Sequence, residues 1–424
     1  MMREMKESGI EWIGRIPEEW EVIPHKFIMH KEKNIKEHYE GEPILSLTMN
    51  GVIVRDLNAG GKMPLTFDGY QIVHAGNLLM CLFDIDVTPR CVGLVNNEGI
   101  TSPAYSNFVM HQGVYAPYYN YLIRYMDDIK CMLHLSKNLR NSLTETDFGA
   151  INSILPPYDE QRRIATFLDN KCSEVDQLIS LQEQFIEELK AYKQSVITEA
   201  VTKGLNPEVE MKESGVEWIG RIPKEWKVSR VGLHYNIILG RMLCPKPLDE
   251  TYTLEKYYCA ANVHFEGITG ELKQMWFSSQ DKSIYKTKKD DLLIVEGGAG
   301  AGGCAILEES NEDIYIQNSI MIARPKRDNN CRYLKYLIEQ LVKKGYIDIV
   351  CNKATIPHFT KEKVSNVPFL VMPPNEQRAI ATYLDTKCAE IDSLIALKQQ
   401  KIDALKDYKK SMIYEYVTGK KQLD

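Results

Sequence analysis

The residues of this 424-residue chain that best suit hydrogen-bonding chemistry lie in two short stretches and in a few proline-containing loops. Residues 137–142 read KNLRNS, and residues 352–358 read NKATIPH. Both stretches mix basic donors with amide side chains. In the major groove of DNA, Arg or Lys suits guanine and Asn suits adenine. The candidate contacts are Arg90, Lys137, Asn138, Arg140, Asn141, Ser142, Arg241, Lys246, Lys353, Thr355 and His358. For any single one of them, a solvated surface charge is an alternative of at least equal weight.

Two patterns that resemble catalytic or cofactor sites carry little weight. Residues 155–158 read LPPY, close to the [DNS]-P-P-[YFW] motif of amino-methyltransferases, but an apolar Leu replaces the polar first residue. Residues 298–303 read GAGAGG and satisfy the G-x-G-x-x-G pattern of dinucleotide sites. The next residues, CAIL, read as a strand, so no helix N-terminus is available for a phosphate. We interpret the second pattern as a tight glycine loop beside DNA or beside a long helix.

Composition excludes several further classes of protein. The 9 histidines form no H-E-x-x-H set, the 10 cysteines show no C-x-x-C spacing, and no Walker A lysine motif is present. We therefore expect no catalytic residue, no bound cofactor and no metal ion. Without a signal-peptide core or a membrane-length apolar run, the sequence predicts a cytoplasmic protein with reduced thiols and no membrane partner. The formal net charge of −6 means that any DNA contact depends on local basic surface or on a partner.

Two long amphipathic segments are the elements that must position these candidates. Residues 156–169 read PPYDEQRRIATFLD, and residues 373–385 read PPNEQRAIATYLD, which is a long internal repeat. Apolar residues then recur at three- and four-residue steps as far as Val196 in the first copy and Met412 in the second. This spacing predicts two helices, each about 65 Å long.

The ends of both helices are marked by residue type. We expect Asp159 and Asn375 to be the N-caps, because their side-chain oxygens can accept backbone N–H groups. Gly204 and Gly419 are expected to end the helices. The two openings differ by Tyr158, which we interpret as a one-residue insertion that changes only the lead-in.

A lone helix of this length with one apolar stripe needs a partner, and its own repeat is the obvious one. Because the second helix starts from the far body of the chain, it can cover the first only by running back along it. The sequence therefore predicts an antiparallel coiled coil. The alternative is a long surface helix packed on a globular core.

A second repeat carries four of the five tryptophans. Residues 5–22 read MKESGIEWIGRIPEEWEV, and residues 211–228 read MKESGVEWIGRIPKEWKV. A Gly-x-x-Pro turn lies between the two tryptophans of each copy. We interpret both copies as packing clasps rather than as binding sites.

The bodies between these repeats share an order of elements but little sequence identity. The expected elements are strands at residues 43–47, 51–54, 78–83 and 291–295, and helices at residues 118–135 and 332–341. In this order, residues 353–356 correspond to residues 140–143. The predicted fold class is α+β, with two mixed α/β domains at residues 1–155 and 206–372. They are joined by helices at residues 156–205 and 373–424, which form the antiparallel coiled coil of an internal pseudo-two-fold repeat.

This alternation of body and helix resembles the specificity subunit of type I restriction–modification systems. The two W-I-G-x-I-P-x-x-W segments and the two P-P-x(1–2)-E-Q-R-x-I-A-x-[FY]-L-D openings carry the resemblance, which covers essentially the whole chain. It implies two target-recognition domains, each of which reads one half of a split target in double-stranded DNA. It also implies that two modification (methyltransferase) subunits dock on the coiled coil and that restriction subunits join them. S-adenosylmethionine, ATP and Mg are then expected on the partner subunits, and this chain is expected to be non-catalytic.

The expected geometry agrees with this resemblance. Half-sites about one helical turn apart, roughly 34–36 Å, suit two reading modules held at opposite ends of a rod. Helix length would then set the unread gap between the half-sites. Two alternatives remain: a coiled-coil scaffold without DNA readout, and a self-sufficient methyltransferase, which would need its own S-adenosylmethionine site.

Overall fold

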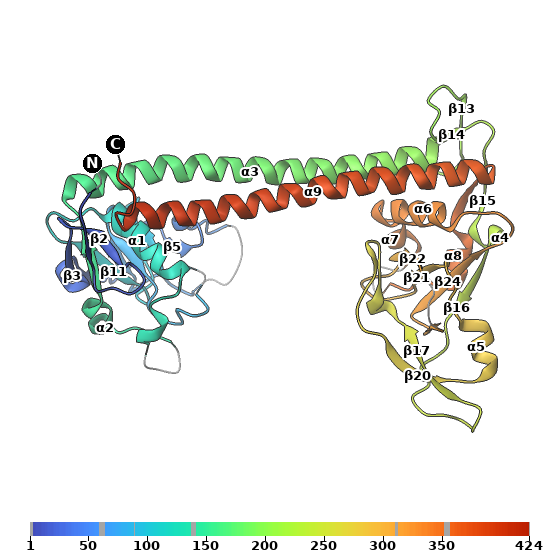
Figure 1. Ribbon diagram of the computed structural model, residues 1–424, viewed down its shortest axis with the longest axis horizontal. Helices are drawn as coiled ribbons and strands as arrows, with labels where there is room; N and C mark the ends of the chain where they lie inside the picture. The colour runs from blue at the N-terminus through green and yellow to red at the C-terminus, as the bar shows by residue number, and fades with distance from the viewer. Residues whose placement is uncertain are drawn as a thin grey trace. The chain divides into compact units, whose positions relative to one another are not determined.

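The computed structural model describes residues 3–58, 64–88, 90–136, 141–309, 313–351 and 357–423. The chain divides into two compact units (Figure 1). Unit 1 comprises residues 1–183 and 399–424, and unit 2 comprises residues 184–398. Each unit therefore contains one body of the chain together with part of each long helix.

A four-stranded antiparallel sheet forms the centre of each unit. The strand order is β4-β11-β8-β9 in unit 1 and β16-β24-β21-β22 in unit 2. The predicted strands β8 and β21 are interior and fully buried, because they contain only apolar residues. The bounds are β4 Met29–Glu32, β8 Leu78–Met80, β9 Val92–Leu94, β11 Ser106–Met110, β16 Tyr235–Leu239, β21 Leu292–Val295, β22 Cys304–Ile306 and β24 Ile320–Pro325.

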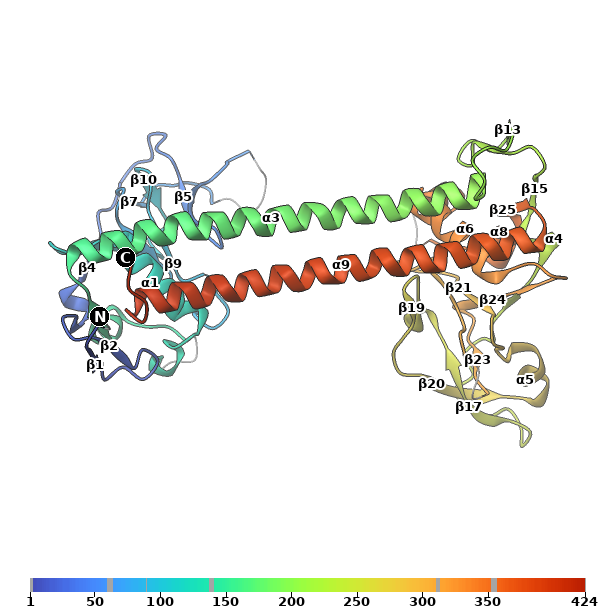
Figure 2. The same cartoon turned by 45° about the horizontal axis from the view of Figure 1, so that its top comes forward.

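One helix packs on this sheet in each unit: α1 (Ala116–Asp128) in unit 1 and α6 (Cys331–Lys343) in unit 2. Their apolar faces share a core with the sheet and with the long helices (Figures 1 and 2). The helix predicted at residues 118–135 is too long. Lys130 adopts a left-handed φ of 52°, which ends the α-helix, and a separate 3-10 turn follows at η2 (Leu133–Leu135).

A strand pair connects each body to its long helix. In unit 1, β3 (Glu21–Pro24) pairs with β12 (Asn152–Leu155), and in unit 2, β15 (Lys227–Arg230) pairs with β25 (Pro368–Val371). Short helices flank these strands in both units. They are η1 His25–Phe27, α2 Glu145–Ala150, α4 Val231–His234, α7 Tyr346–Val350 and α8 Lys361–Asn366.

The tryptophan segments form hairpins that pack on the start of a long helix. The hairpins are β1 Met5–Glu7 with β2 Arg15–Pro17, and β13 Met211–Glu213 with β14 Arg221–Pro223. Trp20 and Trp226 are fully buried, and their indole N–H groups donate to Glu160 (2.9 Å) and Glu376 (3.2 Å). The prediction of packing clasps is confirmed for these two tryptophans.

The bodies differ in the elements inserted between the strands of the central sheet. Unit 1 carries the predicted hairpin β5–β6 and the pair β7–β10, whereas unit 2 carries the three-stranded sheet β20-β17-β23, the pair β18–β19 and helix α5. The bounds are β5 Leu45–Thr48, β6 Gly51–Val54, β7 Gln71–Val73, β10 Gly99–Thr101, β17 Thr253–Tyr258, η3 Ala260–Asn262, β18 Val263–His264, β19 Gly267–Ile268, β20 Lys273–Phe277, α5 Ser279–Tyr285 and β23 Tyr315–Ile316.

The two predicted long helices are α3 (Tyr158–Lys203) and α9 (Pro374–Val417). Their 46 and 44 residues correspond to roughly 65–70 Å of α-helix. Gly204 ends α3 with a left-handed φ of 77°, as expected. Among the described residues, no helix is both long and apolar enough to cross a membrane.

The prediction of Asp159 and Asn375 as N-caps is wrong, because both residues lie inside the first turn. The helices start directly after Pro157 and Pro373, whose carbonyl groups accept the first backbone hydrogen bonds. The first residue of α9 is Pro374, and proline suits this position because its fixed φ is already helical and a helix start needs no N–H there; α3 has Tyr158 at the same position.

The predicted insertion at Tyr158 is also wrong. Gln161 donates from Nε2 to the carbonyl of Pro156, and Gln377 makes the same bond to Met372. The two helices therefore begin at equivalent positions, and Met372 stands where the first copy has a proline.

Helices α3 and α9 pair antiparallel within each unit (Figure 2). Lys409 forms an ion pair with Asp176 in unit 1 (2.6 Å), and Lys193 forms one with Asp392 in unit 2 (2.7 Å). Each partner occupies the same position of the repeat as its counterpart in the other unit. The predicted fold class, with two mixed bodies and an antiparallel helix pair, is confirmed.

Two tyrosines on the covering helix attach each body to both long helices. One donates to a carbonyl at the last turns of one long helix, and the other donates to a carboxylate near the start of the other. The hydrogen bonds are Tyr118–Val417 (2.6 Å) and Tyr121–Asp169 (2.8 Å) in unit 1, and Tyr333–Val201 (3.0 Å) and Tyr336–Asp385 (2.7 Å) in unit 2. The same anchors therefore fix the orientation of two different bodies on the helices.

Candidate nucleic-acid interface

In unit 1, the loop after β8 packs against the segment that precedes α2. Leu143 donates its N–H to the carbonyl of Leu82 (2.8 Å), and Ile85 donates to the carbonyl of Asn141 (3.2 Å). Asn141 adopts a left-handed φ of 43°, and its side-chain oxygen accepts from the Ser136 hydroxyl. The predicted contacts Asn141 and Ser142 therefore lie at the same edge of the sheet as the loop that carries Arg90.

The corresponding loop of unit 2, after β21, packs against the segment that precedes α8. Phe359 donates to the carbonyl of Glu296 (2.6 Å), and Gly298 donates to that of Pro357 (3.2 Å). The ring of His358 is 59% exposed and lies 3.3 Å from the Glu296 carboxylate. The same edge of both sheets thus carries a loop and a second segment that holds predicted contacts.

The caps of α2 and α8 correct the alignment of these segments. Thr144 and Thr360 are equivalent N-caps, and each accepts a hydrogen bond from the third residue of its helix. The residues before these caps, Leu143 and Phe359, are therefore equivalent, whereas the sequence comparison had matched Leu143 with Ile356. The earlier match was three residues out of register.

Several predicted contacts lie outside the described residues. They are Lys137, Asn138, Arg140, Lys353 and Thr355. Their roles stay predictions that rest on residue type and on the described segments that flank them.

In unit 2, a turn that the sequence reasoning missed joins Arg241 to the His358 loop. Arg241 donates its N–H to Ile316 (3.0 Å), and Asn318 donates to the carbonyl of Arg241 (2.9 Å). The next residue, Ser319, accepts from the N–H of Glu296 (2.8 Å). The turn, QNS at residues 317–319, carries two amides between apolar strands, a signal that was present in the sequence.

Arg241 and Lys246, the two predicted cations of this region, differ in how firmly their side chains are held. Arg241 is an ion-pair partner of Asp281 (3.1 Å). Burial is the largest single effect on the pKa of Arg241 and acts to lower it, but Asp281 and Tyr252 together outweigh burial and raise this pKa above its usual value. Lys246 is exposed in the following loop. Arg241 is therefore held in place, whereas the Lys246 side chain extends into solvent.

Arg90 is more buried than an ordinary surface contact. Its side chain is 8% exposed, and its Nη1 atom lies 2.7 Å from Asp128 and 3.7 Å from Asp127 at the end of α1. This position favours a structural ion pair at least as much as a surface charge. Its predicted contact with DNA stays a prediction.

The two rejected motifs have structural explanations. The Pro156 carbonyl, which would bind a target amine in a methyltransferase, accepts a hydrogen bond from Gln161 (2.8 Å). The glycine loop leads into strand β22, as predicted, and so offers no helix N-terminus to a dinucleotide. Gly297 faces His358, where an added Cβ would lie 3.0 Å from the ring, so a close approach explains this glycine.

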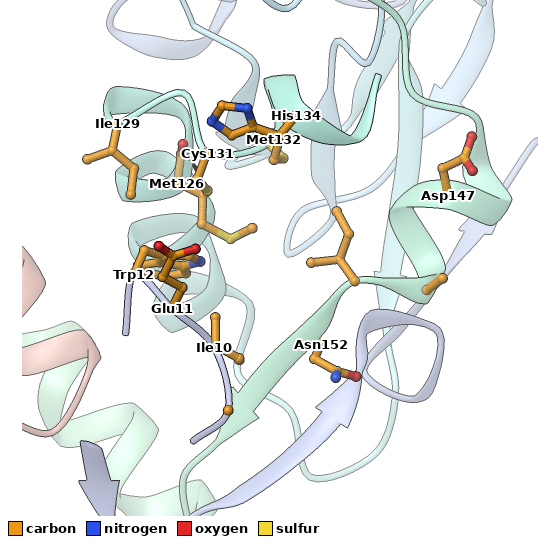
Figure 3. A pocket seen from close by; sticks show the side chains of 13 residues that line it. Ile10, Glu11, Trp12, Met126, Ile129, Cys131, Met132, His134, Asp147 and Asn152 are labelled. Atoms are coloured by element: carbon orange, nitrogen blue, oxygen red, sulfur yellow. Dashed lines mark hydrogen bonds between the residues drawn. The ribbon is translucent and has the colours of Figure 1, made fainter. Parts of the chain in front are cut away.

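Unit 1 also contains a cavity of about 880 Å³, whose lining includes Asp147 of α2 (Figure 3). The first clasp and the end of α1 form it, and the side chains of Trp12, Met126 and His134 are among its lining. None of the predicted contacts that the structure describes lines this cavity.

Comparison with known proteins finds one family model and several relatives that this chain resembles. The family model described as "Type I restriction modification DNA specificity domain" matches residues 223–407. The putative type I restriction enzyme MjaX specificity subunit of Methanocaldococcus jannaschii is 25% identical over 327 residues, which are 72% of this chain and 68% of that one. The chain is therefore similar to the specificity subunits of type I restriction enzymes.

Two further similarities extend over almost the whole specificity subunit. The MjaVIII specificity subunit of the same organism is 23% identical over 425 residues, covering 96% of this chain and 94% of the relative. A chain from a structural study of complex assembly and conformational transition in the type I R-M system aligns with a TM-score of 0.71. That alignment has 17% identity and covers 95% of this chain and 98% of that one. The second similarity concerns the fold alone.

Proposed function

We propose that this chain is a specificity subunit that selects the DNA target of a type I restriction–modification complex, with each unit reading one half of a bipartite, asymmetric sequence. The observation that carries the proposal is a contrast between two parts of each unit. The frame, which is the long helices with their tyrosine and tryptophan anchors, is repeated, whereas the sheet edge, which carries the loops with the predicted contacts, is not. The tyrosine and tryptophan anchors are the same in both units, whereas the residues at the sheet edges differ. A frame that holds two different edges suits the recognition of two different half-sites.

The antiparallel helix pair sets the gap between the half-sites. The equivalent ion pairs of α3 and α9 support a single fixed register, because a slip would separate both pairs at once. Half-sites about one turn of DNA apart, roughly 34–36 Å, suit two reading modules that are carried by one rod of paired helices. Helix length is then the variable that controls the unread gap.

Exposed apolar residues on the long helices support the docking of two methyltransferase subunits. The helices expose Leu178, Leu181 and Tyr192 on α3 and Leu394, Leu397 and Tyr408 on α9. These residues occupy the same three positions of the repeat. Exposed apolar groups of this kind mark interaction surfaces, and two equivalent sets fit two copies of one partner.

The remaining partners follow from the same proposal. Restriction subunits join the complex, and S-adenosylmethionine, ATP and Mg are bound by the partner subunits. This chain supplies selection rather than catalysis. The described residues contain no group of three or more His, Cys, Asp or Glu side chains that could hold a metal ion.

The test is to express the chain with its modification subunits and to map methylated sites by sequencing. We expect one split motif with a fixed gap. Inserting two helical turns, seven residues, into both α3 and α9 lengthens each by about 10 Å. At 3.4 Å per base pair, the gap should grow by about three base pairs while both half-sites stay the same.

An unchanged gap in the insertion variant would contradict the spacer role. A wild-type complex without any split motif would contradict bipartite reading and would favour a scaffold without DNA readout. Inserting the same residues into α3 alone is the matched control, because it should disrupt the pairing of the helices rather than move the half-sites.

A further inference from the structure

Arg90 combines a fixed position with an unused hydrogen-bond donor. Its Nη1 end is held by Asp128 (2.7 Å), with Asp127 close by. Its Nε–H lies buried and has no hydrogen-bond partner among the described residues. A buried donor without an acceptor is uncommon in folded proteins, so the site is short of one acceptor.

Asp127 and Asp128 hold Arg90 in place but do not pair with all of its hydrogen-bond donors. Asp127 accepts from the N–H of Cys91 (2.8 Å) and from Lys130 Nζ (2.7 Å), so donors other than Arg90 already orient it. Lys130 also donates to the carbonyl of Thr88, which ties down the loop leading to Arg90. The guanidinium is thus clamped at one end, and this arrangement presents its remaining donors in a fixed direction.

Two cavities border both Arg90 and the tip of the β5–β6 hairpin. Their volumes are about 250 Å³ and about 290 Å³, and Met49 and Arg90 line both. The second is also lined by Phe83 and Tyr105, which are flat apolar surfaces. The exposed fractions of Met49 (54%) and Phe83 (39%) place its rim at the surface. Apolar walls around a fixed donor suit the edge of a planar group that carries acceptors.

Unit 2 lacks this arrangement at the equivalent position. Gly302 precedes β22 by two residues, as Arg90 precedes β9, and Val342 of α6 stands where α1 has Asp127. A Cβ on Gly302 would lie 2.8 Å from Val342, and its φ is +83°. No arginine side chain fits there. The Arg90 site therefore belongs to unit 1 alone and is no part of the repeated frame.

We infer that Arg90 is a specificity-determining residue of unit 1. The cavity of about 290 Å³ that Arg90 lines together with Phe83 and Tyr105 receives the acceptor edge of a guanine. This inference rests on the proposed function and assigns part of the reading to a named group. Guanine presents N7 and O6 on one edge, which matches the donors of an arginine held in a fixed plane. A backbone phosphate offers the same acceptor chemistry, and the experiment separates the two.

The test uses the full chain in complex with its modification subunits and reads the methylated motif of Arg90→Ala by sequencing. We expect one guanine of a single half-site to become a relaxed position, with discrimination reduced roughly 10-fold or more. The other half-site and the gap should not change. Arg90→Lys, which keeps the charge but loses the fork of donors, should relax the same position.

Arg324→Ala in unit 2 is the matched control. Arg324 also forms a buried ion pair, with Asp291, but its donors are used within the protein. We expect this variant to lower the melting temperature and leave the unit 1 position intact. If Arg90→Ala does not fold, the double variant Arg90→Met with Asp128→Asn removes both charges and is judged by the same motif readout.

Two outcomes would overturn the inference. A folded Arg90→Ala complex whose motif is unchanged removes Arg90 from base reading. Uniform loss of methylation at all sites, with an unchanged motif, assigns Arg90 to a phosphate or to the fold. Either result leaves a split wild-type motif standing, whereas a wild-type complex without a split motif overturns the proposed function as well.

Discussion

Unit 1 and unit 2 are alike where they meet the long helices and unlike where their sheets end. The indole donors of Trp20 and Trp226 reach equivalent glutamates, and Tyr118 and Tyr333 reach equivalent carbonyls. At the sheet edge, by contrast, the arginine of unit 1 is replaced by Gly302 in unit 2. The comparison separates two kinds of constraint, since the frame must repeat for both bodies to be held alike, whereas the edge is free to diverge.

One difference lies inside the frame. His25 of unit 1 and Val231 of unit 2 are equivalent, because each donates its N–H to the residue before the returning strand at 2.9 Å. Both side chains are completely buried. The exchange of an imidazole for a valine therefore changes the electrostatics of the frame without changing its hydrogen bonding.

The largest expected effect tests whether the frame is equally important in both units. Trp20→Ala and Trp226→Ala each remove a buried indole, and each should lower the free energy of unfolding by about 3–5 kcal/mol. The measurement is urea unfolding followed by far-UV circular dichroism. Trp276, which is only half buried on β20, is the matched control and should lose less when changed to Ala. A large loss of unfolding free energy in one variant and none in the other would contradict the equivalence of the two clasps.

The second prediction uses pH to distinguish the two units. Burial lowers the pKa of His25 to about 4, so its ring is neutral in the folded chain, while an unfolded histidine takes up a proton near pH 6.5. Below pH 6.5 the unfolded state binds more protons, so this contribution to stability falls as the pH falls from 6.5 to 4 and is constant above. The full loss is about 3 kcal/mol.

His25→Val, which copies unit 2, should remove this part of the acid sensitivity. The readout is the difference in unfolding free energy between pH 7.5 and pH 4.5 for wild type and variant. The reciprocal change, Val231→His, should introduce acid sensitivity into unit 2. Equal pH dependence of wild type and His25→Val would show that His25 does not differ from an ordinary exposed histidine.

The third prediction concerns the two segments before α2 and α8. Arg140→Ala and Lys353→Ala should weaken methylation at target sites without unfolding the protein, by roughly 1–3 kcal/mol where a base contact is lost. If each unit reads its own half-site, the first variant alters one half of the motif and the second alters the other. Full target activity in both variants would remove these segments from the reading surface.

The frame was predictable from sequence because it is repeated. The two helix openings and the two tryptophan segments could be compared with each other, and helical spacing gave the elements between their ends. The first and last residues of the helices were harder to predict from the sequence. Both helices begin one residue before the expected caps, at Tyr158 and Pro374, so Asp159 and Asn375 lie inside the first turn. The left-handed Lys130 ended α1 before its apolar pattern did.

The site was predicted less well, because residue type does not reveal burial or neighbours. The sequence did not show that Arg90 has ion-pair partners, because Asp127 and Asp128 lie on a helix far along the chain. The turn at residues 317–319 was missed because only folding brings it between Arg241 and Glu296. Contacts between distant loops depend on the sheet that joins them, and no local pattern encodes that junction.

The smallest expected effect tests the register of the helix pair. Asp176→Ala and Asp392→Ala each break one of the two equivalent ion pairs, in which the aspartates are 59% and 56% exposed. Exposed pairs contribute about 0.2–1 kcal/mol and weaken with salt, so each variant should lose no more than this, and both should lose the same amount. Double-mutant cycles with Lys409 and Lys193, at low and high salt, measure each coupling directly. The two ion pairs occupy the same position of the repeat, so equal couplings are expected. Unequal couplings would mean that α3 and α9 are not held alike in the two units, and they would contradict the equivalence of the two units along the helix pair.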